Sequence, residues 1–226
     1  MRLLYPIALL ATTLLSACSI SDSTPPTGSE MLRSEVADSI LSYALPLDEL
    51  PEQLSYLGTP THAFRYRDIE GEHLALFTAS EGEHLGEEIT EGSRDYALYA
   101  YGYTLQPTGP TLTWDAQDFV VGCPFDNMLR LLPGSIHIAD LDDDGLASVS
   151  FAYTIGCRSD VSADGMKVLL YEGERKYAIR GMRRLKMGGA FQNDAEKHLG
   201  ENFDNAPDAL QTHLLKLWDM YEVEEM

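Results

Sequence analysis

The fold is decided by the stretch Ser135-Ile136-His137-Ile138-Ala139-Asp140-Leu141-Asp142-Asp143-Asp144-Gly145-Leu146-Ala147-Ser148-Val149-Ser150-Phe151. On both sides of its aspartates, the residues alternate with the period of two that is typical of a β-strand. Glycine within the acidic run permits a sharp turn. The sequence therefore predicts a β-hairpin closed by an acidic loop, which differs from the helix, loop, helix arrangement of an EF-hand.

The acidic loop has the spacing of a calcium site. Asp140, Asp142 and Asp144 occupy positions 1, 3 and 5, and the backbone carbonyl of Leu146 occupies position 7. Ser148 stands at position 9, where a hydroxyl or a bound water replaces the usual charged ligand. An oxygen cage supplied by protein suits Ca²⁺ better than Mg²⁺. We expect a structural calcium ion, and the alternative is an acidic turn that needs no ion.

A second segment, Asp160-Val161-Ser162-Ala163-Asp164-Gly165, repeats the alternate-oxygen spacing. Its position 9 is Val168, which has no ligand atom in its side chain. We expect Asp160 or Ser162 to support the first loop from across the disulfide, with a separate ion site as the weaker alternative.

The amino terminus predicts a lipoprotein signal. Residues 1–17 combine Arg2, an apolar run and a small-residue cleavage site that ends at Cys18. This pattern resembles a bacterial lipobox, which implies a diacylglycerol thioether and an amide-linked fatty acid, palmitate among them, on Cys18. Several acyl chains are enough for stable anchoring without a spanning helix. An ordinary signal peptide or a transmembrane helix is the alternative.

The rest of the chain predicts one tether and one domain. Residues 18–30 have almost no apolar material to bury and read as a disordered, lipidated tether. Residues 31–226 are long enough for a single globular domain with its own core. Ser19, and not an aspartate, follows the cysteine. By the sorting rule of the lipoproteins that this pattern resembles, this implies the outer membrane, with the domain on the periplasmic side or at the cell surface.

Two cysteines remain once Cys18 carries lipid. Cys123 and Cys157 lie on either side of the acidic loop. An even pair in an oxidising compartment predicts a disulfide bond.

The patterning predicts an α+β fold, with a mainly antiparallel sheet built from hairpins and a helix near each end. Residues 61–67 pair with 72–78 across a glycine turn, and residues 166–171 pair with 175–180 across another. Near-helical spacing predicts a short helix over Ser34–Tyr43. A second amphipathic helix follows Asn205, which is expected to cap it, and has one apolar stripe that ends at Tyr221.

The charge balance excludes one class of partner. The chain has 36 acidic and 16 basic side chains, a formal charge of −20. Such a field repels nucleic acid and attracts cations. The sequence also lacks HExxH, GxSxG, P-loop and SxxK motifs, so no catalytic residue is predicted.

Several motifs together resemble a largely uncharacterised family of bacterial envelope lipoproteins, some of which are labelled surface polysaccharide biosynthesis proteins. The resemblance covers most of residues 95–221 and rests on Asp140–Gly145 (DLDDDG), Cys157–Ser162 (CRSDVS), Met166–Gly173 (MKVLLYEG), Lys176–Gly181 (KYAIRG), Trp114, Asp118, Cys123-Pro124 and Leu217-Trp218. Members of the family tend to have an acidic residue where Ser148 stands and proline where Ala163 stands.

We therefore expect a non-catalytic lipoprotein, bound to the outer membrane by its lipid, with a structural Ca²⁺ loop. The alternative is an accessory protein or an enzyme that acts on envelope polysaccharide. The expected partners are the membrane and, beyond it, envelope polysaccharide or another envelope protein.

Overall fold

The computed structural model describes residues 40–82 and 92–226. Strands account for 56% of these residues and helical elements for 11%. The fold is therefore mainly β, and the prediction of an α+β fold with a helix near each end is wrong.

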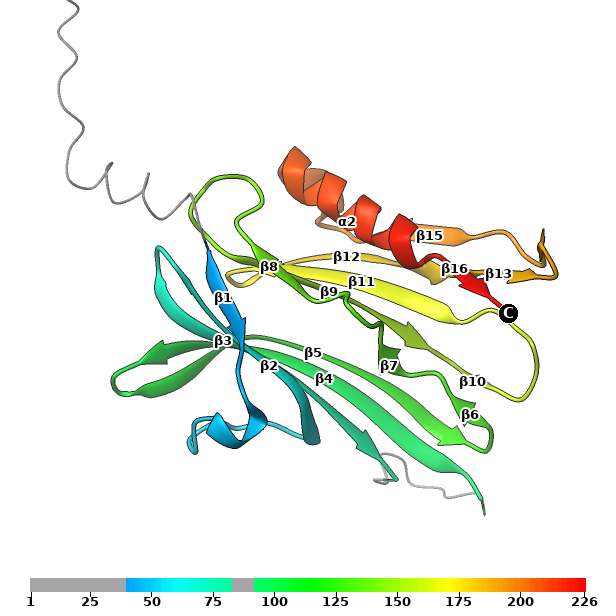
Figure 1. Cartoon of the computed structure of the whole chain (residues 1–226), viewed down its shortest axis with the longest axis horizontal. Helices are drawn as coiled ribbons and strands as arrows, with labels where there is room; N and C mark the ends of the chain where they lie inside the picture. The colour runs from blue at the N-terminus through cyan, green and yellow to red at the C-terminus, as the bar shows by residue number, and fades with distance from the viewer. Residues whose placement is uncertain (1–39, 83–91) are drawn as a thin grey trace, which may run out of the picture.

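The first sheet is an antiparallel meander in which each strand pairs with the next one along the chain (Figure 1). Its strands are β1 (Leu41–Ala44), β2 (Thr59–Asp68), β3 (Gly71–Glu81), β4 (Arg94–Gln106) and β5 (Gly109–Cys123). The hairpin predicted from residues 61–78 is confirmed as β2 and β3.

The second sheet contains the acidic loop. Its strands are β7 (Arg130–Leu131), β8 (His137–Ala139), β9 (Ser148–Ile155), β11 (Gly165–Glu172), β12 (Arg175–Met182) and β15 (Glu196–Leu199). They are ordered β15-β12-β11-β9-β7, and β8 also pairs with β9. The predicted hairpins β8–β9 and β11–β12 are both confirmed.

Short elements complete the described chain. β6 (Asp126–Asn127) pairs with β10 (Cys157–Arg158), and β13 (Arg184–Met187) lies between β14 (Ala190–Phe191) and β16 (Val223–Glu225). The helical elements are the 3-10 turns η1 (Leu47–Glu49) and η2 (Phe203–Asn205) and the helix α2 (Asp208–Tyr221).

The two sheets and α2 form three layers (Figure 1). Between the sheets, Phe77 and Trp114 of the first sheet belong to one apolar cluster with Phe151 and Tyr171 of the second. On the opposite face of the second sheet, α2 buries its predicted apolar stripe. That stripe consists of the buried residues Leu210, Leu214, Leu217 and Trp218 and the partly buried Tyr221.

The helix predicted over Ser34–Tyr43 is replaced, where the structure describes it, by β1. Residues 34–39 lie outside the described residues, as do the signal peptide, Cys18 and the tether. Leu41–Ala44 pairs with Phe64–Arg67 of β2, which gives these backbone groups partners in a sheet ladder. Leu41 and Tyr43, expected on the buried side of a helix, are 67% and 48% exposed.

The amino-terminal boundary of α2 also differs from the prediction. Asn205 ends η2, and Pro207 is the residue that precedes the helix, with no side-chain capping bond. The fixed φ of proline suits the start of a helix. The prediction that Asn205 caps α2 is therefore wrong, while the helix itself is confirmed.

Candidate metal centre

Three loop carboxylates come together between β8 and β9. Asp140, Asp142 and Asp144 each offer an oxygen, and these oxygens all lie within 4.8 Å of one another. The group could hold a metal ion. It is the one such group of three or more acidic, histidine or cysteine side chains in residues 40–82 and 92–226.

The loop backbone is shaped for this convergence. Asp143 has φ 61° and Gly145 has φ 86°, both in the left-handed region, so the chain reverses sharply within the acidic run. The backbone N–H of Gly145 donates to Asp140 Oδ2 (2.8 Å), and that of Leu146 donates to Asp144 Oδ1 (2.8 Å). These bonds hold two of the three carboxylates in place.

Two carboxylate oxygens in this group are buried without a donor. Asp140 Oδ1 and Asp142 Oδ1 have no hydrogen-bond partner. Burial raises the pKa of Asp142, and the negative charges of Asp144 and Asp140 raise it further. A buried oxygen without a partner is costly, and a cation would satisfy both oxygens and the surrounding charge.

Ser148 contacts a further acidic residue that the sequence analysis missed. Its hydroxyl donates to Glu172 Oε1 (3.0 Å), and both side chains are buried. Glu172 ends β11 at the position paired with Ser148. Burial raises the pKa of Glu172, the bond from Ser148 lowers it, and the charges of Asp142 and Asp144 raise it again. Glu172 therefore adds a further acidic side chain beside the three converging carboxylates.

The loop also contacts the first sheet, through the turn between β2 and β3. Ile69 N donates to the carbonyl of Gly145 (3.1 Å), and Ala147 N donates to Asp68 Oδ2 (3.1 Å). Asp68 Oδ1 accepts from His73 Nε2 (2.8 Å). Burial acts to raise the pKa of Asp68, but bonds from His73 and the backbone lower it overall. The acidic loop is thus bonded to both sheets.

Nothing in the sequence pattern identified Asp68 or Glu172 as neighbours of the loop. Asp68 is the last residue of β2 and Glu172 the last residue of β11, so in the sequence each one looks like an ordinary residue before a turn. Their proximity comes from the strand register of the second sheet and from the way the first sheet packs on it.

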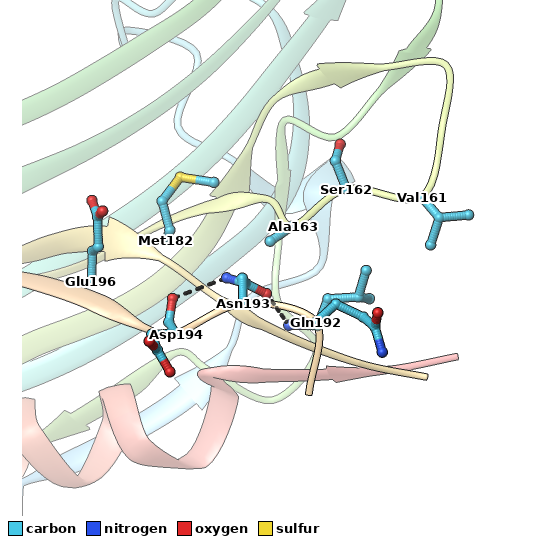
Figure 2. Close-up of a pocket in the computed structure, with 9 residues that line it drawn as sticks. Val161, Ser162, Ala163, Met182, Gln192, Asn193, Asp194 and Glu196 are labelled. Atoms are coloured by element: carbon cyan, nitrogen blue, oxygen red, sulfur yellow. Dashed lines mark hydrogen bonds between the residues drawn. The ribbon is translucent and has the colours of Figure 1, made fainter. Parts of the chain in front are cut away.

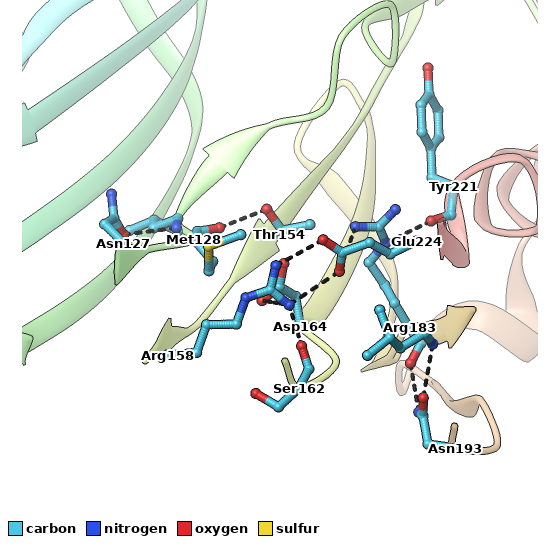
Figure 3. Close-up of polar contacts among 12 residues, drawn as sticks. Asn127, Met128, Thr154, Arg158, Ser162, Asp164, Arg183, Asn193, Tyr221 and Glu224 are labelled. Atoms are coloured by element: carbon cyan, nitrogen blue, oxygen red, sulfur yellow. Dashed lines mark hydrogen bonds and ion pairs between the residues drawn. The ribbon is translucent and has the colours of Figure 1, made fainter. Parts of the chain in front are cut away.

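The segment Asp160–Gly165 does not support the acidic loop. Arg158 Nη1 donates to the carbonyl of Ser162 and lies 3.4 Å from Asp164 Oδ1, while Arg158 Nη2 lies 2.8 Å from Glu224 Oε1 (Figure 3). The segment therefore belongs to a separate polar cluster that holds the carboxyl-terminal strand β16, and our interpretation of it as part of the calcium site is wrong.

Asp164 in this cluster should make stability depend on pH. It is 2% exposed, and its Oδ2 has no partner. Burial raises its pKa from 3.8 to about 6; Arg158 opposes this shift and Glu224 adds to it. The folded state binds the proton of the Asp164 carboxyl more tightly than the unfolded state does. The protonated carboxyl therefore adds to stability below pH 4, and this contribution is lost as pH rises through 6.

Asp164→Asn should therefore remove a pH-dependent part of the free energy of unfolding. We expect the difference in free energy of unfolding between wild type and variant to fall by roughly 1–3 kcal/mol as the pH rises from 4 to 7.5. Urea unfolding at several pH values measures it. Asp160→Asn, at an exposed position of the same segment, should show no such change, and a pH-independent difference for Asp164→Asn would contradict the assignment.

A surface hollow lies beside this cluster (Figure 2). Its volume is about 480 Å³, and it is lined by Val161, Ser162, Ala163, Met182, Leu185, Gln192, Asn193, Asp194 and Glu196. The Asn193 side chain donates a hydrogen bond to the carbonyl of Arg183 and accepts one from the N–H of Leu185. The lining provides neither a histidine nor a cysteine to act as base or nucleophile.

One serine does contact a histidine, between β9 and α2. Ser150 Oγ lies 2.7 Å from His213 Nε2, and the His137 ring lies 5.7 Å from that of His213. Burial lowers the pKa of His213, and His137 and Lys216 lower it further. Ser150 is 1% exposed, so its hydroxyl is shielded from any substrate. This contact packs the helix on the sheet.

The disulfide predicted between Cys123 and Cys157 is confirmed, with an Sγ–Sγ distance of 2.04 Å. It joins the end of β5 in the first sheet to β10, which follows β9 of the second.

Comparisons with known proteins give no further assignment. No protein-family model matches the chain, and neither the curated proteins nor the solved structures contain a match. The resemblance to envelope lipoproteins stays a prediction. Among the described helices, none is long and apolar enough to cross a membrane.

Proposed function

We propose that this protein is a non-catalytic lipoprotein, anchored in the outer membrane through Cys18, whose domain is stabilised by a calcium ion bound in the loop between β8 and β9. The proposal rests on the convergence of Asp140, Asp142 and Asp144, two of whose carboxylate oxygens are buried without a hydrogen-bond donor. The residues present fit a hard cation, because all the available ligand atoms are oxygens.

Calcium is the ion that this set of ligands favours. Three carboxylates converge in the loop, the sequence pattern adds the Leu146 carbonyl as a fourth oxygen, and Glu172 lies beside them. Ser148 uses its hydroxyl proton toward Glu172, so its oxygen keeps a lone pair for the ion or for a bound water. Mg²⁺ demands a tighter octahedral shell and gives up water reluctantly.

The ion would act as a structural clamp. Gly145 and Ala147 of the loop bond to the β2–β3 turn, and Ser148 bonds across β9 and β11. Neutralising the carboxylates removes their mutual repulsion in a loop of the second sheet that is also hydrogen-bonded to the first sheet. An added Cβ at Gly145 would lie 2.8 Å from Ile69 Cγ2, which shows how closely the turn and the loop pack.

Asp142→Asn should abolish stabilisation by calcium. A ligand at 100 times its dissociation constant stabilises the folded state by about 2.7 kcal/mol. We therefore expect saturating calcium to raise the wild-type melting temperature by several degrees and to leave the variant unchanged. Thermal unfolding in a chelator and in millimolar calcium measures both proteins.

Asp143→Asn is the matched control. Asp143 lies in the same loop, is exposed, and is not part of the converging group. Asparagine tolerates its left-handed backbone. The control should keep the full calcium response, and equal loss in both variants would mean that only total loop charge matters.

Cys18→Ala tests the anchor. Without the acceptor sulfur no diacylglycerol can be attached, so we expect the protein to move from the membrane fraction to the soluble fraction of a bacterial envelope preparation. The measurement is fractionation with immunodetection, beside Ser19→Ala as a variant that keeps the cysteine. If Cys18→Ala stayed with the membrane, lipid anchoring at this position would be excluded.

A further inference from the structure

Strand β1 carries exposed apolar side chains at the point where the described chain begins. Leu41 and Tyr43 are both exposed, and they are paired across the strands with Arg67 and Arg65 of β2. Residues paired in this way project from the same face of a sheet. These four residues, which we call the β1–β2 patch, place two large apolar side chains beside two guanidinium groups.

The patch lies on the face of the first sheet that points away from the second sheet. Arg65 is paired with Leu74, which belongs to a buried cluster formed by the first sheet and the segment between β1 and β2. The adjacent residues Tyr66 and Ala75 belong instead to the core between the two sheets. Because side chains alternate between the two faces of a strand, the patch is on the outer face.

The rest of this outer face is covered by the chain itself. The segment between β1 and β2 packs on it through four partly buried apolar side chains, Leu45, Leu50, Leu54 and Tyr56. The Tyr103 hydroxyl donates to the carbonyl of Ser55 (2.5 Å) and holds this segment on the sheet. Leu41 and Tyr43 precede the covering segment and stay exposed, so the apolar surface is open at this end of the sheet.

The charge of the patch differs from that of the whole chain. Arg65 Nε donates to Glu72 Oε2 (3.1 Å), and Arg67 Nε donates to Glu72 Oε1 (2.5 Å). Two guanidinium groups therefore share one carboxylate, which leaves one positive charge in excess here, although the chain has a formal charge of −20. An anionic lipid surface repels an acidic chain but attracts a pair of exposed arginines.

The patch is also the part of the described structure that lies nearest in the sequence to the proposed lipid. Ile40, which directly precedes β1, is 22 residues after Cys18, and a stretch of this length spans at most about 80 Å. A domain held this close to a bilayer meets its surface at an effective concentration on the order of 1 mM. A weak contact by a few side chains is then enough to orient the domain.

We propose that the β1–β2 patch docks on the membrane surface, with Leu41 and Tyr43 among the lipid headgroups and Arg65 and Arg67 on lipid phosphates. This orientation rests on the proposed lipid anchor at Cys18. Tyrosine is enriched at membrane–water interfaces, and arginine reaches phosphate oxygens from an apolar stem. With the outer face of the first sheet on the membrane, α2 lies in the layer farthest from it (Figure 1).

Fluorescence of the full lipidated protein in vesicles tests this orientation. Tyr43→Trp places an indole in the patch, and Met220→Trp places one at an exposed position of α2 as the matched control. Both variants keep the buried Trp114 and Trp218 as the same background. The vesicles contain phosphatidylethanolamine and phosphatidylglycerol with brominated acyl chains, which quench an indole that reaches them. We expect the bromolipid to quench the emission added by Tyr43→Trp by about half and that added by Met220→Trp not at all.

A second substitution in the Tyr43→Trp protein locates the contact. Leu41→Glu removes an apolar side chain from the patch and adds a negative charge, so the quenching should fall at least about twofold. Val161→Glu is the matched control, because Val161 is an exposed aliphatic residue between β10 and β11 and the charge changes by the same amount. It should leave the quenching unchanged, and an equal loss in both variants would overturn the proposal.

Flotation of the same vesicles separates failure of the docking from failure of the anchor. Protein that does not float with the vesicles would refute the anchor at Cys18 and this orientation with it. Protein that floats, but whose Tyr43→Trp emission is quenched no more than that of Met220→Trp, would keep the anchor and overturn the docking. The patch would then face solvent or another envelope protein.

Discussion

Replacing Cys123 and Cys157 together by alanine should lower the free energy of unfolding by about 3–4 kcal/mol. The disulfide closes a segment with a sequence separation of 34, and the entropy that it removes from the unfolded chain gives this magnitude. The closed segment contains the whole acidic loop and joins the edge of the first sheet to the end of β9. Its loss therefore loosens the connection between the sheets as well.

Urea unfolding of the double variant and of wild type, each with and without reductant, measures the effect. Reduced wild type should unfold at the same urea concentration as the variant, and oxidised wild type at a clearly higher one. If reductant left the wild-type midpoint unchanged, the disulfide would not contribute to stability. Alkylation of unreduced protein should label neither cysteine.

Trp218→Ala should destabilise the domain by about 3–5 kcal/mol, the range for deleting a large buried aromatic side chain. Trp218 is fully buried between α2 and the second sheet, and its Nε1 donates to Glu222 Oε2 (3.1 Å). Truncation leaves a cavity and also removes this bond at the end of the helix.

Met220→Ala on the same helix is the control for Trp218→Ala. Met220 is 57% exposed, so its truncation should change stability by less than about 0.5 kcal/mol. Chemical unfolding of both variants measures the difference. A loss below 1 kcal/mol for Trp218→Ala would mean that α2 does not pack on the sheet as described.

Hairpins were the part of the fold that the sequence predicted well. Alternation over residues 61–67 and 166–171, together with glycine at the turns, depends on local geometry that a short stretch of chain encodes. The helix predicted at Ser34–Tyr43 failed where it can be checked, because Leu41–Ala44 gains a ladder partner in β2 that local spacing cannot reveal.

The candidate site was predictable in part for the same reason. Asp140, Asp142 and Asp144 lie within a few residues of one another, so their spacing alone predicts convergence. Glu172 and Asp68 reach the loop only through strand register and through the packing of one sheet on the other. Such distant neighbours leave no pattern in the sequence.

The contrast between local spacing and distant contacts also explains why the prediction for the second loop was wrong. Asp160–Gly165 has the spacing of a ligand set, but its Asp164 contacts Arg158 of β10. Gly165 pairs with Ile155, at the opposite end of β9 from the acidic loop. Spacing identified a possible ligand set, and tertiary contacts with an arginine decided against it.

Calorimetric titration of the chelator-treated domain with calcium tests the central claim most directly. Converging carboxylates with two unsatisfied buried oxygens predict a saturable heat, a stoichiometry of one ion per chain, and no comparable heat for Asp142→Asn. If millimolar calcium released no saturable heat from the wild-type domain, the acidic loop would be a turn that needs no ion, and the proposed clamp would be wrong.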